Sequence, residues 1–460
     1  MAWAAFGPML PVIMKRRVFL GHLARGSLVA AVPAWGTDSV GGANDRVRLG
    51  VIGCGGRGRY VARQLQGAGA EIVALCDVYE TNLRAANREF GGACRCFGDF
   101  RKLLEQRDVD AVLIATPDHW HAIPTVLACE AGKDVYVEKP LGHNIREGQA
   151  IVRAARQHAR IVQTGTQQRS APHFQEARQI IQGGELGKVH FVRIWNYMNF
   201  ASRRFDRARE PQPADVDWDF YLGPAPQVPF DWSRFVGGYR WYFDYAGGLI
   251  TDYGTHRLDT MHQIMDVEAP LTVSAAGNRF ELSAQGDVPD VLQVTYEYPG
   301  FLVSYEACAL NAHGVGGRTP GRSYYLAQGA EDRPHGLAFY GTKGALFADR
   351  LGFEVYPELT PAAMSPPDGT EGVRVNRKER AGRDASDAHA RNFLECVRTR
   401  RAPVADVQLG HLASTACHLG NIAYKTGHKL RWDATREQIL DDPPAQALLG
   451  RQARKPWDVI

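Results

Sequence analysis

The feature that most constrains the fold of this chain is a glycine-rich loop between an apolar strand pattern and a helix pattern. The loop has the sequence GCGGRG over residues 53–58 and directly follows the apolar run 47–52. In such a unit the first glycine permits a tight turn, the second lets backbone N–H groups approach a pyrophosphate, and the third lets the helix pack against the sheet. The spacing predicts dinucleotide binding by Gly53, Gly55, Gly56, Arg57 and Gly58.

Alternating strand and helix patterns surround this loop from residue 46 to about residue 165. Short apolar strands separated by helices are typical of a parallel, doubly wound sheet that is covered on both faces. We therefore expect an NAD-binding Rossmann domain over residues 45–166. Its expected strands are 47–52, 72–76, 111–115, 135–137 and 161–163, and its expected helices are 60–65, 81–90, 121–131 and 145–158.

A second pattern, in which apolar and polar residues alternate, follows this domain. It predicts a large, mainly antiparallel sheet with one open face, flanked by helices at 257–265 and 387–398. We expect a C-terminal α+β domain for substrate binding and oligomerisation over 167–432, and a tail over 433–460. An open sheet face is a common self-association surface, so we expect a homodimer or homotetramer. The elements ahead of the sheet are a helix at 173–181 and a strand at 189–195, and the alternating runs are 272–278, 291–298, 302–309, 337–340 and 345–348.

A long segment over residues 201–240 interrupts the second domain. It is too long for an idle connection and carries much apolar area that needs burial. We expect it to wall the active site. Its large aromatic residues, together with the one that follows it, are Trp218, Phe220, Tyr221, Trp232 and Trp241.

Polar residues after the Rossmann strands predict further cofactor contacts. Asp77 ends the second strand, roughly 20 residues beyond the last loop glycine, where a carboxylate accepts hydrogen bonds from the adenosine ribose and repels a 2′-phosphate. We therefore expect NAD in preference to NADP. Thr116, Pro117 and His121 follow the strand pattern at 111–115, at the sheet edge where ligands gather. His121 either contacts the nicotinamide half or only begins a helix.

The tripeptide Glu138-Lys139-Pro140 follows the strand pattern at 135–137. Hydride transfer from a secondary alcohol needs a base for the hydroxyl proton and a cation that stabilises the developing alkoxide. Lys139 suits the cation role, and we expect Glu138 beside the cofactor. The alternative is that Lys139 is a solvated surface residue.

A second catalytic motif, GGLITDYGTH, occupies residues 247–256. Asp252 and His256 are four positions apart, so a helix start would place both on one face. We expect Asp252 to orient the imidazole and His256 to accept the substrate proton. The alternative is that Asp252 is a helix cap and His256 a surface residue. Candidate substrate contacts near the predicted active-site segments are Arg169, His173, Arg240 and Trp241.

Eight cysteines are scattered along the chain without a regular framework. The one close pair, Cys94 and Cys96, is separated by a single residue, which is not a usual zinc spacing. We expect no metal site and no structural disulfide.

The N-terminus has the pattern of a twin-arginine signal peptide over residues 1–34. The basic run KRRVFL at 15–20 is followed by a short apolar stretch and small residues near Ala34. We expect export by the twin-arginine machinery to the periplasm, with no membrane span in the mature form. Met14 is an alternative start, and a disordered basic tail is the alternative interpretation. Four of the basic residues lie in this leader, so the net charge of +4 falls to near zero in the mature chain, which argues against a nucleic-acid partner.

Taken together, these motifs resemble the Gfo/Idh/MocA oxidoreductase family, the group of glucose–fructose oxidoreductase and inositol dehydrogenase. The resemblance covers nearly all of residues 46–457 and rests on GCGGRG at 53–58, ATPDHWH at 115–121, EKP at 138–140, GGLITDYGTH at 247–256 and GTKGAL at 341–346. It implies a Rossmann domain, an oligomerising C-terminal domain and a Lys–Asp–His constellation at Lys139, Asp252 and His256. The segments WDFYLGPAP at 218–226 and ALLGRQARKPW at 447–457 resemble an exported branch of the family.

Three functions are compatible with this resemblance. The first is NAD-dependent oxidation or reduction of a sugar or polyol. The second is a glycoside hydrolase or lyase that uses a tightly bound NAD only transiently, through oxidation, elimination, hydration and reduction. The third is a non-enzymatic sugar sensor that holds NAD, against which the presence of all three catalytic residues argues.

Overall fold

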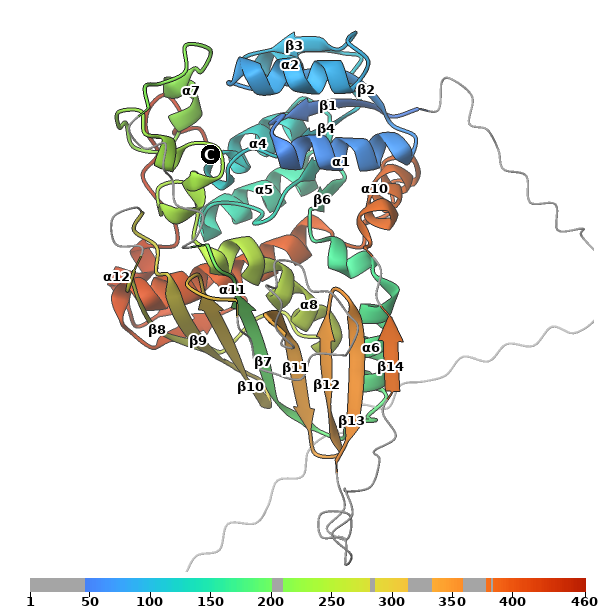
Figure 1. Ribbon diagram of the computed structural model, residues 1–460, viewed down its shortest axis with the longest axis vertical. Helices are drawn as coiled ribbons and strands as arrows, with labels where there is room; N and C mark the ends of the chain where they lie inside the picture. Colours follow the sequence, from blue (N-terminus) through green and yellow to red (C-terminus); the bar gives the residue numbers. More distant parts are fainter. Residues whose placement is uncertain (1–45, 201–209, 282–285, 313–332, 359–377, 382–383) are drawn as a thin grey trace, which may run out of the picture. The chain divides into compact units, whose positions relative to one another are not determined.

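The computed structural model describes residues 46–200, 210–281, 286–312, 333–358, 378–381 and 384–460. The expected signal peptide over 1–34 lies outside these ranges. Residues Asp45–Ile460 form one compact body that contains both expected domains (Figure 1). No described helix combines the length and apolarity needed to cross a bilayer.

The N-terminal half is the predicted parallel, doubly wound sheet. Its six strands follow the order β3-β2-β1-β4-β5-β6, and every neighbouring pair is parallel. β3 and α3 are absent from the sequence-based expectation, because three residues of mixed polarity and a five-residue helix are too short to show a period. The strands are β1 (Arg48–Ile52), β2 (Glu71–Cys76), β3 (Arg95–Phe97), β4 (Ala111–Ile114), β5 (Asp134–Val137) and β6 (Val162–Thr164), and the helices are α1 (Gly56–Gly67), α2 (Glu80–Glu89), α3 (Phe100–Leu104), α4 (Ala122–Glu130) and α5 (Ile145–Gln157).

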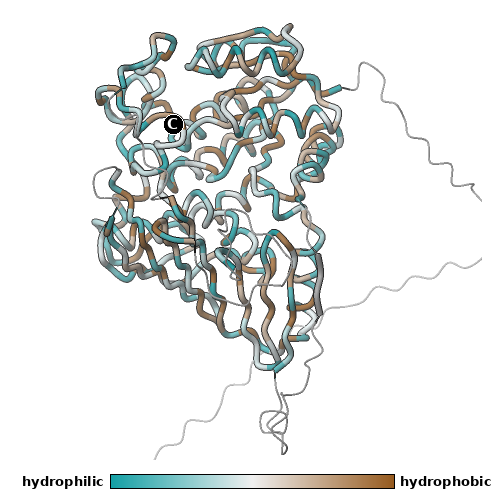
Figure 2. The backbone as a smooth tube through the Cα atoms, in the orientation of Figure 1, coloured by the Kyte–Doolittle hydropathy of each residue, from teal (hydrophilic) through white to brown (hydrophobic). Residues whose placement is uncertain are grey.

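The C-terminal half contains a ten-stranded sheet with the order β14-β13-β12-β11-β7-β10-β9-β8-β15-β16. The sheet is mainly antiparallel, as expected, but β7 and β10 pair in parallel, which makes it a mixed sheet. Apolar residues are concentrated in the strands (Figure 2). The strands are β7 (Val189–Tyr197), β8 (Thr272–Asn278), β9 (Val291–Tyr298), β10 (Phe301–Cys308), β11 (His335–Gly341), β12 (Gly344–Asp349), β13 (Gly352–Pro357), β14 (Lys378–Ala381), β15 (Leu430–Asp433) and β16 (Gln438–Leu440).

Three helices pack on the face of this sheet that is directed toward the Rossmann domain: α6 (Pro172–Gln182), α8 (Thr255–Met265) and α11 (Val407–Thr426) (Figure 1). The hydroxyl of Tyr296 on β9 donates to the Ala416 carbonyl oxygen of α11 at 3.1 Å. α11 also packs against α5 of the Rossmann domain and is buried on nearly all sides. No described helix covers the opposite face of the sheet.

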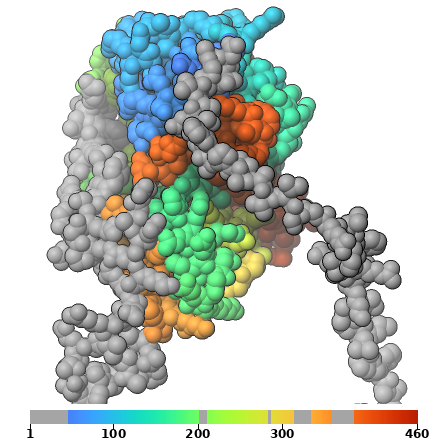
Figure 3. Space-filling view, turned by 90° about the vertical axis from the view of Figure 1, so that its right-hand side faces the viewer, coloured from blue at the N-terminus to red at the C-terminus, as the bar shows by residue number. Residues whose placement is uncertain are grey.

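Helix α10 (Ser386–Thr399) corrects one expectation. It does not flank the C-terminal sheet but packs on α1, where Phe393 and Leu394 join a core with Val61 and Leu65. The space-filling view shows α10 (red-orange) directly beside the Rossmann domain (blue) (Figure 3). Its amphipathic pattern indicates a buried face, but sequence pattern alone does not indicate which partner buries it.

The described part of the long aromatic segment, residues 210–241, folds over the Rossmann domain, and we call it the strap. It contains α7 (Trp218–Leu222) and two short 3₁₀ turns, η4 (Trp232–Arg234) and η5 (Gly238–Trp241). Val216 pairs with Tyr79 in an antiparallel bridge just after β2. The C-terminal residues also pack here: after α12 (Pro443–Ala447), the Trp457 ring lies 4.8 Å from that of Trp120, centroid to centroid.

Candidate active site

The glycine loop surrounds a hollow at the carboxyl edge of the Rossmann sheet. Gly53 has a φ of +91°, and a Cβ there would lie 2.6 Å from the Ala115 carbonyl carbon. A Cβ on Gly58 would lie 1.9 Å from the Gly53 carbonyl oxygen. By contrast, a Cβ on Gly56 would meet no atom within 4 Å, and one on Gly55 only the Asn82 side chain at 3.9 Å. The turn and the packing thus require Gly53 and Gly58, whereas Gly55 and Gly56 leave room for a ligand.

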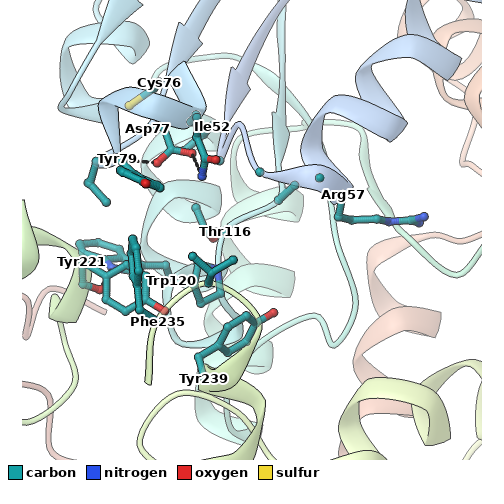
Figure 4. A pocket seen from close by; sticks show the side chains of 18 of the residues that line it. Ile52, Arg57, Cys76, Asp77, Tyr79, Thr116, Trp120, Tyr221, Phe235 and Tyr239 are labelled. Atoms are coloured by element: carbon teal, nitrogen blue, oxygen red, sulfur yellow. Dashed lines mark hydrogen bonds between the residues drawn. The ribbon is translucent and has the colours of Figure 1, made fainter. Parts of the chain in front are cut away.

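Asp77 lies at the end of β2 beside this loop (Figure 4). Its carboxylate accepts hydrogen bonds from the backbone N–H groups of Cys54 at 2.7 Å and Tyr79 at 2.8 Å. Burial raises the pKa of Asp77 to about 6, although these N–H groups oppose the shift. The carboxylate is therefore anchored at the position where the sequence predicts an adenosine ribose.

Two adjoining cavities extend from the loop. The first, of about 220 Å³, lies against Gly53, Gly55, Asp77 and Pro117. Its other side is formed by the strap, which contributes Phe220, Tyr221, Phe235 and Tyr239; Figure 4 shows Tyr221 and Phe235 clustered with Trp120 below Asp77. The second, of about 460 Å³, shares Arg57, Thr116 and Arg240 with the first. The strap therefore walls both cavities, in line with the expectation for this segment.

The second cavity brings together residues from both domains. Lys139, just after β5, donates through Nζ to Asp252 Oδ1 at 2.5 Å and to the Asp252 carbonyl oxygen at 2.8 Å. His256 lines the same cavity from the start of α8. The predicted convergence of the lysine, the aspartate and the histidine is therefore present in the folded chain.

The Asp252 carboxylate binds two cations rather than the imidazole. In addition to the hydrogen bond from Lys139, it accepts a hydrogen bond from Arg240 Nε at 3.1 Å. Burial alone would raise the pKa of Asp252, but Lys139 and Arg240 lower it to about 2. The structure records hydrogen bonds to the Asp252 carboxylate from Lys139 and Arg240 and none between Asp252 and His256, so the expected orienting contact is not seen.

His256 is buried, and its Nδ1 has no hydrogen-bond partner among the residues that the structure describes. Burial lowers its pKa well below the usual value, and the nearby charges of Arg350, Lys139 and Arg57 add to the effect. The imidazole is therefore neutral at physiological pH, with a free nitrogen that can accept a proton.

The backbone ahead of α8 explains the glycine pair of the motif. Residues Ile250–Gly254 form a π-helical turn, η6, a feature that is frequent at functional sites. Gly248 has a φ of +73°, and a Cβ on Gly247 would lie 2.5 Å from both Asn421 and Thr251. Larger residues would therefore displace the turn that carries Asp252.

Glu138 is buried and pairs with Arg57 Nε at 2.7 Å. Burial would raise the pKa of Glu138, but the Arg57 guanidinium holds it below its usual range. A Cβ on Gly165 would lie 2.8 Å from Glu138 Oε1, so glycine is needed for the close approach of this carboxylate. The pair links the glycine loop to β5.

Among the other predicted cofactor residues, Thr116 lines both cavities, and its buried hydroxyl has no partner within the described ranges. Pro117 lines only the first cavity. His121 lies at the second cavity, with Nδ1 2.6 Å from the Pro140 carbonyl oxygen and Nε2 3.1 Å from that of Thr116. Both ring nitrogens face backbone, so His121 braces the cavity wall.

The four candidate substrate residues divide into two groups. Arg240 and Trp241 line the second cavity. Arg169 and His173 line neither cavity: Arg169 Nε pairs with buried Asp259 at 2.7 Å, and His173 Nε2 lies 3.1 Å from the Asp349 carbonyl oxygen. These contacts give Arg169 and His173 a structural role outside the two cavities.

Among the residues that line the second cavity, sequence reasoning did not single out the polar residues Asp118, Tyr239, Tyr253 and Arg350. Asp118 lies within the DHW segment that follows β4, so its position after a strand was an available signal. Arg350 lies after β12, with no local motif around it.

The residues present fit a dinucleotide. The open backbone at Gly55 and Gly56 suits a pyrophosphate, and the Asp77 carboxylate suits a ribose. Thr116 and His256 line the second cavity, where a nicotinamide and a hydroxyl-bearing substrate would meet. Within the described ranges no group of three histidine, cysteine or carboxylate residues is arranged to hold a metal ion.

Comparison with known proteins gives two adjacent family matches. Residues 47–166 match the model described as "Oxidoreductase family, NAD-binding Rossmann fold" of the GFO/IDH/MocA group. Residues 173–302 and 377–459 match its "C-terminal alpha/beta domain". The two matches cover most of the chain.

Individual relatives agree with these matches. Myo-inositol 2-dehydrogenase of Thermotoga maritima is 24% identical over 80% of this chain and 93% of its own length. Other curated relatives match over only 39% to 46% of their own length. Among solved structures, the WlbA dehydrogenase of Bordetella pertussis, in complex with NADH and UDP-GlcNAcA, has a TM-score of 0.61 at 18% identity, covering 84% of this chain and 99% of that one. Levoglucosan dehydrogenase, in complex with NADH and levoglucosan, has a TM-score of 0.62 at 16% identity, with the same coverage.

Proposed function

Because this chain belongs to the Gfo/Idh/MocA oxidoreductase family, we propose that it transfers a hydride between a nicotinamide dinucleotide and a secondary hydroxyl carbon of a sugar, polyol or glycoside. The observation that carries this proposal is the second cavity, where Lys139 from one domain and His256 from the other face the same space. The sugar and polyol dehydrogenases among the relatives support the substrate class.

Each residue of the cavity has a distinct role in this proposal. When bound, the nicotinamide supplies the hydride acceptor. Lys139 donates a hydrogen bond to the reacting oxygen and stabilises the charge that develops there. His256 accepts the hydroxyl proton, since it lines the cavity and its imidazole is neutral. Asp252 holds the Lys139 ammonium in place through two hydrogen bonds.

Two variants test these roles. Lys139→Met and His256→Ala should each lower kcat/KM by about 10²–10⁴-fold, because each removes a group that acts on the transition state. The dissociation constant for NADH, measured by fluorescence titration, should stay within a factor of about three. Lys343→Met is the matched control, because Lys343 is exposed on the β11–β12 turn outside both cavities. Near-normal turnover in both active-site variants would refute the assignment.

We further propose NAD as the cofactor in preference to NADP, held through many turnovers. The anchored Asp77 carboxylate supports the preference, because it would repel a 2′-phosphate. The strap supports retention of the bound cofactor, because it forms one wall of the first cavity. It is hydrogen-bonded to the Rossmann domain at Tyr79, Glu80 and Thr81.

This enclosure also favours a second candidate function, glycoside cleavage by a redox-neutral cycle in which the retained NAD is reduced and then reoxidised. Incubating the purified holoprotein with aryl glycosides separates the candidates. Aglycone release without added cofactor supports the cycle, and stoichiometric NADH formation supports net oxidation. Sugar binding without turnover of either kind would instead indicate a sensor.

Two broader proposals concern the whole chain. We propose self-association through the sheet face that no described helix covers.

We also propose export to the periplasm by the twin-arginine machinery, on the basis of the KRRVFL motif. In a cell fractionation experiment, changing Arg16 and Arg17 to lysine should retain the protein in the cytoplasm, and sequencing of the exported form should find its start near residue 35. An exported form that keeps Met1 would contradict this proposal.

A further inference from the structure

The second cavity contains more cationic than anionic side chains. Arg57 pairs with Glu138, the two cations Lys139 and Arg240 pair with Asp252, and the carboxyl group of Asp118 also lines the cavity. A fourth cation, Arg350, also lines the cavity, and it forms no ion pair with any residue that the structure describes. Of the four cations that line the cavity, Arg350 is therefore the one without a direct ion pair among the described residues.

Arg350 is exposed at the edge of the cavity, and its neighbours position the turn that carries it. It follows β12 at a turn in which Asp349 Oδ1 accepts from the Leu351 N–H at 2.6 Å, while the Asp349 carbonyl oxygen lies 3.1 Å from His173 Nε2. The Gln168 amide satisfies its surroundings when its nitrogen donates to Thr260, and its oxygen then accepts from Arg350 Nε at 3.2 Å. One edge of the guanidinium is thus anchored, and the two terminal nitrogens have no partner in the described chain.

The carboxylates near Arg350 are already engaged. Asp252 binds Lys139 and Arg240, and Asp384 accepts from the Tyr60 hydroxyl at 2.9 Å and from the Ser386 N–H at 3.0 Å. The cofactor phosphates are not the obvious partner either, because Arg350 does not line the cavity at the glycine loop. A negatively charged group on a molecule in the second cavity is within reach of this exposed guanidinium.

We propose that the substrate is an acidic sugar, a uronate or uronate glycoside, whose carboxylate pairs with Arg350. This inference rests on the proposed function of the same cavity. The planar fork of a guanidinium matches a carboxylate through two parallel hydrogen bonds. The reacting hydroxyl then lies between Lys139 and His256, and the carboxylate is the handle that orients the ring.

The arrangement also has an electrostatic consequence for His256. Burial lowers its pKa first, and Arg350 is the nearby charge with the largest additional effect. A carboxylate placed on Arg350 would cancel that charge and raise the basicity of the imidazole. The acidic substrate thus improves the base that reacts with it, whereas a neutral sugar leaves His256 a weaker base.

Binding to the NADH-loaded holoprotein, measured by isothermal titration calorimetry, tests the proposal. The probes are D-glucuronate and D-galacturonate, their neutral counterparts D-glucose and D-galactose, and glucose 6-phosphate. At least one uronate should bind roughly 10- to 100-fold more tightly than its neutral counterpart. In Arg350→Gln this ratio should fall to near one, and Arg350→Lys, which keeps the charge but not the fork, should give an intermediate ratio. Arg88→Gln is the matched control, because Arg88 is exposed on α2 outside both cavities and should leave the ratio unchanged.

Three results would overturn the proposal. The first is that neither uronate binds more tightly than its neutral counterpart. The second is that glucose 6-phosphate binds more tightly than both uronates. The third is that Arg350→Gln weakens NADH binding and leaves the uronate ratio intact, which would assign Arg350 to the cofactor. The proposed oxidoreductase function is separated by assaying NADH formation: uronate binding without hydride transfer would sustain the acidic-sugar proposal and refute the redox one, and turnover of neutral sugars alone would do the reverse.

Discussion

Asp77 shows how one buried carboxylate combines cofactor binding with sensitivity to pH. Its two backbone N–H donors position it, and burial raises its pKa to about 6. Most aspartates are fully ionised throughout the physiological range, but Asp77 loses its charge within it. The repulsion that disfavours a 2′-phosphate should therefore weaken in mildly acidic solution.

We expect the ratio of the NADPH to the NADH dissociation constant to narrow as the pH falls from 8 to 5, because Asp77 becomes protonated near pH 6. Fluorescence titration of cofactor-stripped protein at several pH values measures this ratio. Asp77→Asn is the control, since it keeps the side-chain shape while the 2′-phosphate still titrates. Equal slopes in the variant and the native protein would show that Asp77 does not cause the change.

Asp252 contributes to stability through its two cations. Burial opposes its ionisation, but Lys139 and Arg240 lower its pKa to about 2, below the value of about 3.9 in an unfolded chain. A carboxylate with a lowered folded-state pKa stabilises the protein above the unfolded pKa and loses that contribution as the pH falls toward the folded pKa. The relevant window is therefore between about pH 4 and pH 2.

We predict that Asp252→Asn removes this acid-dependent loss. The free energy of unfolding of the native protein, from urea denaturation, should fall by about 2 kcal/mol more between pH 4 and pH 2 than that of the variant. Asp441→Asn is the surface control, because Asp441 forms an exposed ion pair with Arg431. If the native protein and Asp252→Asn lose stability in parallel, the Lys139–Asp252–Arg240 cluster does not have the energetic role described.

At the scale of elements, the strap decides how enclosed the cofactor cavity is. Asp215 accepts hydrogen bonds from the backbone N–H of Thr81 at 3.0 Å and from its hydroxyl at 2.6 Å. It thereby caps the first turn of α2 from a distant part of the sequence. The Asp217 N–H adds a bond to the Val78 carbonyl oxygen at 3.0 Å. The strap is thus attached to the residues that directly follow Asp77 at the end of β2.

Loosening this fastening should speed cofactor release. We expect Asp215→Ala to raise the NADH dissociation rate about fivefold, the equivalent of one lost helix cap. Stopped-flow fluorescence with excess NAD as the trap measures this rate. Glu395→Ala, which removes an exposed carboxylate from α10, should leave the rate unchanged. An unchanged rate in Asp215→Ala would mean that the strap does not limit release.

At the scale of the whole molecule, the sheet face that no described helix covers carries a row of aromatic side chains. The ring centroids of Phe191 and Tyr340 are 5.7 Å apart, those of Tyr340 and Phe347 are 6.0 Å apart, and those of Phe347 and Tyr356 are 5.7 Å apart. Leu302 on β10 lies beside Phe191 in register and is 46% exposed. Such an apolar row in the middle of a broad sheet favours burial against a second copy.

We predict that Leu302→Glu shifts the protein toward the monomer, because it places a charge in an apolar contact. Size-exclusion chromatography with light scattering measures the mass, and circular dichroism checks that the variant is folded. Leu448→Glu is the control, since Leu448 is also exposed but follows α12, away from this face. A native protein that is monomeric, or a Leu302→Glu variant of unchanged mass, would refute self-association through this face.

Most of the Rossmann half and the backbone turns of the site could be predicted from local sequence pattern. Local period and glycine placement specify β1, the loop and α1, because Gly53 and Gly58 are required by contacts within a few residues or with the adjoining strand. The pair Gly247-Gly248 likewise marks the turn before α8. These features depend on short-range sterics, which a sequence pattern records directly.

The pairing of the charged side chains, by contrast, could not be predicted from the sequence. The sequence spacing suggested that Asp252 binds His256, yet Asp252 binds Lys139, which is 113 positions away, and Arg240. Three other features were also set by contacts between distant parts of the chain. They are the position of α10 on the Rossmann domain, the attachment of the strap to the residues after β2, and the presence of Arg350 in the second cavity. Each depends on which surfaces meet when the chain packs. The energy of an ion pair depends on the distance between the two charges in space and on their burial, not on their separation along the chain.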